Sequence, residues 1–304
     1  MADPDNPAPN SRAAMVVVTP TYAPDLELFT DLHQSVLRWF PNDVRHVAVV
    51  NDRDMDLFRV FEGPRCTVLG VSEVLPRSVV PLPRTKLWLN LRRPVPPLRG
   101  WILQQIIKLA VVQTLPERVI VAADSDLVFF RPVTVETFAP AGRARLYRLD
   151  DGVGESLPRH LRWHSAAHRL LGLPPPPSPP LPDYVSSLNT WDGDVVRRMI
   201  RRVEEVTGLP WIHAVGKELH ISEWTLYGVY ADQFEQAGSV TLTPESLCHS
   251  YWDTAPLGAD DATSWLSTAG PPDVAYMISA KSGTPQETRR NAHAAAFDRR
   301  QPAE

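Results

Sequence analysis

Hydrophobic residues fall into short runs along the chain, and several of these runs are followed by segments in which apolar residues recur at helical spacing. Four β-branched-rich runs predict strands covered on both faces: residues 15–19, 46–51, 66–69 and 118–123. Between them, residues 25–40 and 99–114 have the spacing of amphipathic helices. This alternation predicts an α/β fold with a twisted, mostly parallel sheet and helices on both of its faces.

The most informative stretch runs from Arg99 to Val133. It begins as a helix, breaks at Pro116, continues as the buried strand 118–123 and then carries the acidic triplet Asp124–Asp126 (Asp-Ser-Asp) before a second apolar run. Hard divalent cations take oxygen ligands, so two carboxylates at a strand end are suited to hold a cation against a phosphorylated ligand. A solvated turn or a helix N-cap is the alternative interpretation of such a triplet.

Polar residues also follow the first two predicted strands. The loop Pro20–Pro24 (Pro-Thr-Tyr-Ala-Pro) ends the first strand, and Asp25 is suited to cap the next helix. The second strand runs into Asn51–Asp54, where Asp52 is able to accept a hydrogen bond from a base or a ribose but is equally typical of a turn. Ligands of open α/β sheets bind at the carboxyl ends of strands, so both loops are candidate ligand contacts.

A second informative segment, His220–Tyr230, predicts a helix that is capped by Ser222 and has Glu223 in its first turn. Glu223 has two interpretations. A first-turn carboxylate stabilises the helix dipole, whereas a carboxylate held in a cleft beside Trp224 is able to bind sugar hydroxyls or to remove a proton from an acceptor. The sequence alone leaves both open.

Composition narrows the classes of function. The chain has 304 residues, of which 43% are hydrophobic, and this is enough for the core of one large domain or two small ones. A net charge of -4 gives no support for a nucleic-acid partner bound through its phosphates. Cys66 and Cys248 are the only cysteines and lie far apart, which favours a reducing, cytoplasmic location over a disulfide scaffold or a zinc site.

The two ends of the chain differ from its middle. Residues 1–14 lack the apolar core of a secretory signal, and no later apolar run reaches the ~18 residues of a membrane span. We expect residues 1–14 to form a disordered N-terminal tail and the Ala- and Arg-rich residues 284–304 to form a flexible C-terminal tail. Residues 15–283 are then predicted to be a single domain.

Three motifs together resemble a bacterial family of glycosyltransferase-like proteins with the GT-A fold and unassigned specificity. They are Gln-Gln-x-x-Lys-Leu at 104–109, Asp-Ser-Asp at 124–126 and Ser-Glu-x-x-x-Tyr-Gly at 222–228, and they span about the central half of the chain. The resemblance implies a Rossmann-like GT-A domain with a nucleotide-binding part over about 15–133 and an acceptor-binding part over about 134–283. It implies that a hexose or pentose passes from a nucleotide-diphosphate sugar, a UDP-sugar being favoured, to a small molecule, natural product or glycan.

The resemblance also implies roles for single residues. Mn2+ or Mg2+ would be held by Asp126, by Asp124 directly or through water, and by His249, because a late histidine completes the metal's ligands in several such families. A buried, hydrogen-bonded structural role is the alternative for His249. Lys108 would help to place the donor, and Glu223 would be the base or the acceptor-binding acid. The remaining donor contacts would come from the strand ends: Thr19, Pro20, Thr21, Tyr22, Asp52, Asp124 and Ser125.

Two other functions stay open on the sequence. Nucleotidyltransferases share the βαβ start and a metal-binding acid at a strand end, but they usually carry a Gly-rich, basic loop after the first strand, and Pro20–Pro24 is not one. The other is a catalytically inactive binding protein with the same fold. The Gly-x-x-Lys-Pro-Trp continuation of the best-known retaining families is absent after His249, so inversion or retention at the sugar is undecided, as is the oligomeric state.

Overall fold

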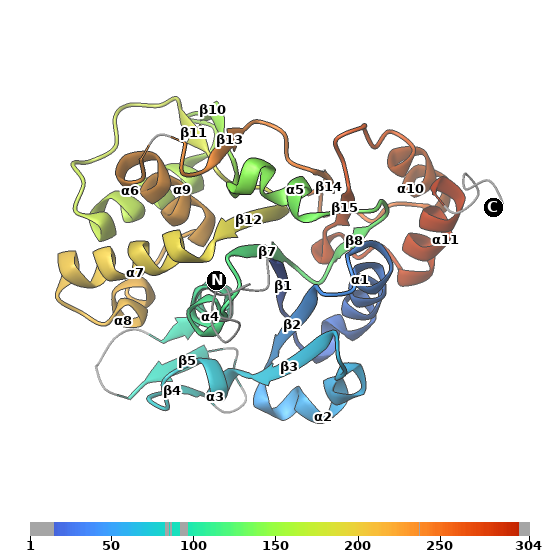
Figure 1. Cartoon of the computed structure of the whole chain (residues 1–304), viewed down its shortest axis with the longest axis horizontal. Coiled ribbons are helices and arrows are strands. Elements are labelled where there is room, and N and C mark those ends of the chain that lie inside the picture. The colour runs from blue at the N-terminus through green and yellow to red at the C-terminus, as the bar shows by residue number, and fades with distance from the viewer. Residues whose placement is uncertain (1–14, 83–84, 86, 92–96, 237, 298–304) are drawn as a thin grey trace, which may run out of the picture.

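The structure is a computed structural model that describes residues 15–82, 85, 87–91, 97–236 and 238–297; the predicted N-terminal tail, residues 1–14, lies outside this part. Its centre is a five-stranded sheet in the order β12-β7-β1-β2-β3 (Figure 1). Strands β7, β1, β2 and β3 are parallel, and β12 runs antiparallel to β7. The strands are β1 (Met15–Pro20), β2 (Arg45–Val50), β3 (Cys66–Gly70), β7 (Val119–Ala123) and β12 (Leu188–Asp192). The predicted α/β architecture with a parallel-rich sheet is confirmed.

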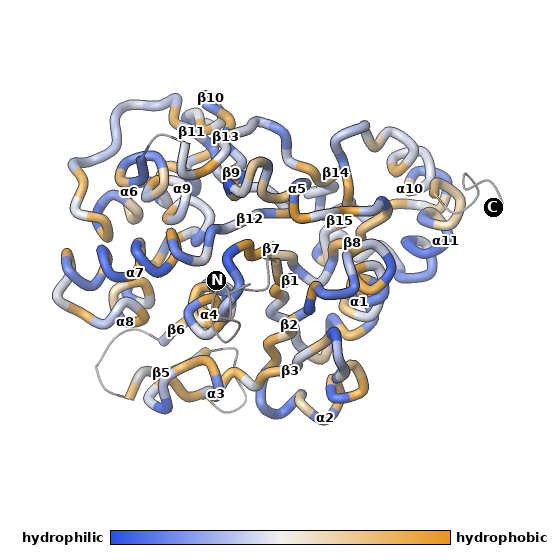
Figure 2. Tube along the Cα trace, viewed as in Figure 1, coloured by the Kyte–Doolittle hydropathy of each residue, from blue (hydrophilic) through white to orange (hydrophobic). Residues whose placement is uncertain are grey.

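The central strands are buried on both faces because helices cover both faces. Val16 and Val18 of β1 pack with α4 (Gly100–Thr114), α7 (Gly193–Thr207) and α9 (Glu223–Phe234). Val17, which points the other way, packs with α1 (Leu26–Trp39) and α5 (Val135–Phe138). Figure 2 shows the resulting concentration of hydrophobic residues along β1 and β7. Both predicted long helices of the first half are present as α1 and α4.

A three-stranded sheet, ordered β14-β15-β8, continues the molecule on the side of α1. It consists of β8 (Leu127–Phe129), β14 (Cys248–Tyr251) and β15 (Ala275–Ile278), and it packs against α10 (Ala259–Leu266) and α11 (Gln286–Ala296).

Helix α11 corrects the expectation of a flexible tail over 284–304. Alanine is the strongest helix former, and the small side chains of Ala292 and Ala296 are buried against a cluster that includes Phe130. Phe297 stacks on Phe130 with ring centroids 4.1 Å apart. Helix α11 is also joined to α1, because Gln286 and Arg290 donate hydrogen bonds to the carboxylate of Asp31. Residues 298–304 lie outside the described part.

The remaining elements form the edges of the molecule. Small sheets pair β9 with β13, β10 with β11, and β5 with both β4 and β6. Their bounds are β4 (Val79–Pro81), β5 (Leu87–Asn90), β6 (Leu98–Arg99), β9 (Arg145–Tyr147), β10 (Leu149–Val153), β11 (Leu181–Asp183) and β13 (Thr241–Thr243). The other helices are α2 (Met55–Phe58), α3 (Val71–Val74), α6 (Pro158–Leu171) and α8 (Trp211–Gly216), with short 3-10 turns η1 (Ala23–Asp25), η2 (Asp52–Asp54), η3 (Arg59–Phe61), η4 (Pro140–Gly142) and η5 (Ala280–Ser282).

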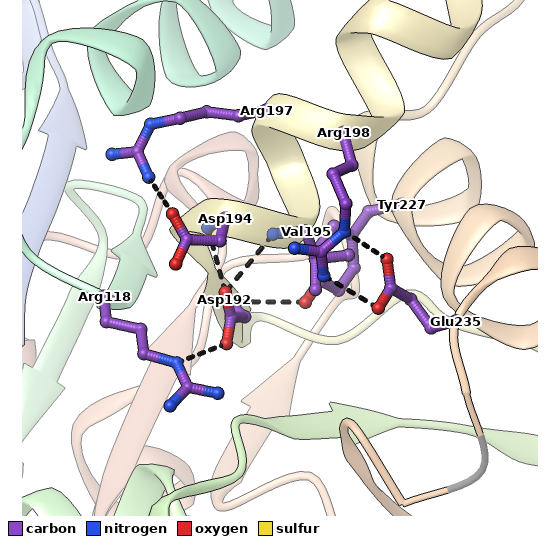
Figure 3. A network of polar contacts seen from close by, with 8 residues as sticks. All are labelled: Arg118, Asp192, Asp194, Val195, Arg197, Arg198, Tyr227 and Glu235. Atoms are coloured by element: carbon purple, nitrogen blue, oxygen red, sulfur yellow. Dashed lines mark hydrogen bonds and ion pairs between the residues drawn. The ribbon is translucent and has the colours of Figure 1, made fainter.

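A polar network around Asp192 joins β12, α7 and α9 at the amino end of β7 (Figure 3). The Asp192 carboxylate accepts hydrogen bonds from the backbone of Asp194 and Val195, which caps α7, and from Arg118 Nε at 2.8 Å. The Asp192 N–H donates to the Tyr227 hydroxyl at 3.0 Å. This network holds the fold at the end of β7 that lies opposite the Asp124 turn.

None of the helices in the described ranges combines the length and the apolar character that a membrane span requires.

Candidate active site at the carboxyl end of β7

The acidic triplet lies where the chain passes from one sheet to the other. Strand β7 ends at Ala123, and Asp124–Asp126 forms the turn that leads into β8. Leu127 N donates to Asp124 O at 3.2 Å and closes this turn. Because β1 is the parallel neighbour of β7, the loop that follows β1 lies beside the turn. The triplet therefore occupies the edge of the sheet at which open α/β proteins bind ligands.

Lys108 lies on the buried face of α4 and directs its ammonium group at this turn. Its Nζ lies 2.7 Å from Asp124 Oδ1 and 3.1 Å from Glu223 Oε1. The same nitrogen lies 4.4 Å from the ring centroid of Trp224, within the range of a cation–π contact. The lysine and both carboxylates that were expected in the site are thus brought together, although Lys108 and Glu223 are 115 residues apart in sequence.

Glu223 is placed by two contacts that the sequence partly predicts. It is the first residue of α9, whose N-cap Ser222 accepts a hydrogen bond from Thr225 N. The Glu223 N–H donates to Gln105 Oε1 of α4 at 3.0 Å. The start of α9 is therefore fixed against α4, one turn before Lys108.

The rest of the Ser-Glu-x-x-x-Tyr-Gly motif serves the fold. The Tyr227 hydroxyl accepts the Asp192 hydrogen bond described above. At Gly228, a Cβ atom would lie 2.2 Å from Tyr184 Cγ, so only glycine allows the Tyr184 ring to pack against α9. Within this motif, the side chains of Glu223 and Trp224 contact Lys108.

The charges of the cluster depend on one another. Burial acts to lower the pKa of Lys108, but the charges of Asp124 and Glu223 more than offset it and leave that pKa above its ordinary value, so Lys108 stays protonated. Burial raises the pKa of Glu223, and the neighbouring Lys108 opposes this rise. Glu223 is only 4% exposed, whereas the Asp124 side chain is 49% exposed. Lys108 consequently joins a solvated carboxylate to a buried one.

Asp126 lies on the other side of the turn. Its Oδ2 accepts a hydrogen bond from Ala280 N at 2.8 Å. Burial, and then the charge of Asp124, raise the pKa of Asp126 to about 6. Lys108 pairs with Asp124, but the ionised form of Asp126 remains disfavoured, and a divalent cation bound at the turn would favour it.

Arg289 of α11 was missed by the sequence analysis because it lies in the supposed tail. Its guanidinium is buried and donates to three main-chain carbonyls, Thr284 O, Ile278 O and Ser279 O. These bonds fix the segment that presents Ala280 N to Asp126, and the Arg289 charge partly opposes the rise in the pKa of Asp126. We assign Arg289 a positioning role behind the turn.

Asp25 is a second residue whose place in the site was not predicted. It occupies the N-cap position of α1, but its side chain makes no capping hydrogen bond, contrary to expectation. Instead its Oδ2 accepts from Ser125 Oγ at 3.1 Å. Burial, and to a smaller extent the charge of Asp124, raise the pKa of Asp25. The available signal was topological: the loops after two adjacent parallel strands must meet.

The expected donor contacts in the first loop divide into buried and accessible residues. Thr19 is fully buried and its hydroxyl is hydrogen-bonded to His46 Nε2 at 3.0 Å, so it faces the core and not a ligand. Pro20 and Thr21 are also buried, and Thr21 N donates to Val49 O. Tyr22 is half-buried next to Asp25, whose charge adds to burial in raising the Tyr22 pKa. Of these four residues, Tyr22 is the one with exposed surface beside the turn.

Asp52 and His249 are engaged elsewhere. Asp52 Oδ1 accepts hydrogen bonds from the backbone and hydroxyl of Ser72, so the structure supports the turn interpretation. His249 stacks on Trp265 with centroids 4.1 Å apart, and its Nε2 lies 3.1 Å from Trp265 O. No group of three or more His, Cys, Asp or Glu side chains in the described ranges is arranged to hold a metal. The contacts of His249 are with Trp265, which favours the structural alternative for this residue.

Comparison with known proteins gives a family and a distant structural likeness. A model of a family of unknown function, DUF6492, matches residues 14–265. The crystal structure of mouse xyloside xylosyltransferase 1 in its apo form is 12% identical in sequence, with a TM-score of 0.46, and the match covers 90% of this chain and 100% of that one. No curated protein sequence matches the chain. A likeness this distant leaves the chemistry to be argued from the residues of the site.

Proposed function

The chain belongs to the family of unknown function DUF6492, and we propose that it is a GT-A-like glycosyltransferase whose active site is the Asp124–Asp126 turn. The observation that carries the proposal is the pairing of Lys108 with Asp124, next to Asp126, at the carboxyl end of a parallel strand. A phosphorylated donor at this edge needs positive charge, and the turn offers both a lysine and a carboxylate pair that favours a cation.

Asp124 and Asp126 fit a partial ligand set for Mn2+ or Mg2+. Both ions prefer oxygen ligands, and Mg2+ in particular is usually held by one or two carboxylates together with substrate phosphates and water. The position of both carboxylates in one turn at the end of β7 supports this assignment, because a cation there would favour the ionised form of Asp126, which burial and then the charge of Asp124 disfavour. When bound, the cation supplies charge neutralisation for the departing diphosphate.

The protein's own residues would divide the remaining work. Lys108 holds Asp124 in place and contributes positive charge to the diphosphate side of the site. The half-exposed Tyr22 is the proposed contact of the nucleoside, with a UDP-sugar as the favoured donor, whereas the buried Ser125 holds the turn through its bond to Asp25. Glu223 is the best candidate for either a base or a residue that positions Lys108, and its ion pair favours positioning. The acceptor would enter from the side of α9.

Product analysis tests this function against its two rivals. Incubation with a nucleotide sugar should release the nucleoside diphosphate, whereas release of pyrophosphate from a nucleoside triphosphate and a sugar phosphate would identify a nucleotidyltransferase. Tight nucleotide binding without either product would identify a binding protein.

The variant Asp126→Asn tests the turn itself. Loss of a residue that only supports a metal ligand typically lowers activity by ~10- to 100-fold. Because Asp126 is proposed to bind the metal itself, Asp126→Asn should reduce product release by more than this. Asp56→Asn is the matched control, because the Asp56 side chain is 94% exposed on α2. Normal turnover by Asp126→Asn would remove the turn from the active site.

The variant Glu223→Gln separates the two roles of Glu223. Loss of a general base should lower kcat by ~10²–10⁴-fold with little change in donor affinity. Loss of a positioning contact should weaken donor binding through Lys108, and wild-type kinetics would exclude Glu223 from the site.

A further inference from the structure

A group of basic and aromatic side chains continues the site along α4, away from the turn. We call it the basic rim, and it consists of Trp101, Arg159, Arg162, Trp163 and His220. Trp101 precedes Lys108 by two helical turns, so both side chains lie on the same face of α4, about 10 Å apart along its axis. Helix α4 leads back into the amino end of β7, and Lys108 in its middle reaches Asp124 at the carboxyl end of that strand, so the first turn of α4 lies on the ligand side of Lys108.

Arg159 is oriented by aromatic rings instead of a carboxylate. Its guanidinium carbon lies 4.4 Å from the Trp101 centroid and 5.3 Å from the Trp163 centroid. The two indole rings contact each other with centroids 5.8 Å apart. Arg159 is exposed, and it forms no ion pair with any residue in the described ranges. Its charge is therefore held in position and available to a ligand.

Arg162 adds a second cation one helical turn further along α6. Its Nη1 lies 3.3 Å from His220 Nε2, and it makes no ion pair within the described part of the chain. Two acids near the rim lie against other bases, Asp183 against His160 and Glu218 against Arg169, while Glu155 is an exposed acid that precedes α6. A surplus of positive charge at this rim stands out in a chain whose net charge is -4.

The basic rim is joined to the proposed active site through two short connections. Gln105 accepts from Glu223 N at 3.0 Å, and its Nε2 lies 3.4 Å from Trp101 O. His220 lies two residues before Ser222, the cap that fixes Glu223. A ligand on the rim would thus lie next to the acceptor side of the Lys108 and Glu223 pair.

We propose that the basic rim binds an anionic group of the acceptor, a phosphate or a carboxylate located about 10 Å from Lys108. This inference rests on the proposed glycosyltransferase function and names its acceptor class: a sugar phosphate or a uronic acid in preference to a neutral sugar. Arginine is suited to the task because its planar fork binds both oxyanions in bidentate fashion.

Binding of inorganic phosphate tests the rim independently of turnover. With a saturating nucleoside diphosphate present, phosphate should quench or enhance the fluorescence of the rim tryptophans. Arg159→Gln should weaken this binding by about 10- to 100-fold, the worth of a charged hydrogen bond. Arg201→Gln, on the exposed face of α7, is the matched control and should stay within twofold. Equal phosphate affinity in wild type and Arg159→Gln would overturn the inference. It would also be overturned if Arg159→Gln lost affinity for the nucleoside diphosphate and kept its affinity for phosphate.

Acceptor competition tests the consequence for transfer. Wild type should use a hexose phosphate or a hexuronic acid with a higher kcat/KM than the matched neutral hexose, and Arg159→Gln should erase this preference while melting at the wild-type temperature. The same preference in Arg159→Gln would overturn the inference. Hydrolysis of the donor without acceptor is measured in parallel, because its absence in wild type would contradict the proposed function. In that case the phosphate titration still tests whether the basic rim binds an anion.

Discussion

Replacing Lys108 with methionine tests the charge balance on which the site depends. The Lys108 ammonium lies within 3.1 Å of two carboxylates that differ in their access to water, the side chains of Asp124 and Glu223 being 49% and 4% exposed. Methionine keeps much of the apolar stem of lysine but has no charge. Asp124 is then able to turn to solvent, whereas Glu223 stays buried without a partner.

The expected cost follows from this asymmetry. Removing one partner of a buried ion pair typically costs about 3–5 kcal/mol, so Lys108→Met should lower the free energy of unfolding by about 3 kcal/mol or more above pH 7. Burial already raises the pKa of Glu223, and loss of Lys108 raises it further. A carboxyl group with a raised pKa in the folded state adds stability below its unfolded pKa and loses it as pH rises through the folded pKa. The deficit should therefore shrink from pH 8 to pH 5.

Urea unfolding followed by tryptophan fluorescence, at pH 5 and pH 8, measures both effects. Adding Glu223→Gln to Lys108→Met removes the buried charge and should restore about 1–3 kcal/mol at pH 8. Arg59→Met is the control, because Arg59 and Asp56 form an exposed pair and its loss should cost less than about 1 kcal/mol. Two results would refute the charge balance of Lys108, Asp124 and Glu223. One is a loss of less than about 1 kcal/mol in the free energy of unfolding of Lys108→Met at pH 8. The other is a double variant that is no more stable than Lys108→Met alone.

Three further predictions concern the surroundings of the turn. Burial and the neighbouring carboxylate raise the pKa of Asp126 to about 6, and only the ionised form binds a cation. Calorimetry should therefore show that the Mn2+-dependent affinity for the nucleotide rises between pH 5 and pH 7. An affinity that does not change over this range would contradict the role of Asp126 as a metal ligand. His249→Phe keeps a ring for stacking and should leave the Mn2+ dependence within twofold, whereas its loss would return His249 to the ligand set. Arg289→Met removes three hydrogen bonds to main-chain carbonyls, so it should lower the melting temperature and weaken metal-dependent nucleotide binding. The control is Arg290→Met, which replaces the half-exposed neighbouring arginine and should leave this binding unchanged. Equal effects of the two variants on binding would exclude the positioning role of Arg289.

The sheet could be predicted because its signal is local. A β-branched run between breaks is buried whatever its partner, and the run at 118–123 appears as β7 over Val119–Ala123. The same applies to the start of α9, because Ser222 and Glu223 define a capped helix within a few residues. Only the family resemblance predicted that Lys108, Asp124 and Glu223 share one site. Sequence periodicity gives no information about contacts between residues that are 115 positions apart.

The errors arose where a side chain has a choice of partner. Thr19 lies at a strand end, and whether its hydroxyl faces a ligand or the core is decided by His46 on the neighbouring strand. Asp25 has the position of a helix cap, yet it binds Ser125, 100 residues away. Helix α11 was assigned to a tail because an Ala- and Arg-rich composition has no apolar stripe, although alanines pack closely when a partner such as Phe130 covers them.

Calorimetric titration of UDP into the protein, with Mn2+ and with EDTA, tests the central claim most directly. We expect wild type to bind UDP at least about tenfold more tightly with Mn2+, a difference of about 1.4 kcal/mol. Asp126→Asn should lose this difference while melting no lower than wild type at pH 8, because it replaces an acid that is destabilised by its own ionisation. Equal affinities of the wild-type protein for UDP with Mn2+ and with EDTA would contradict a metal-assisted donor site at Asp124 and Asp126.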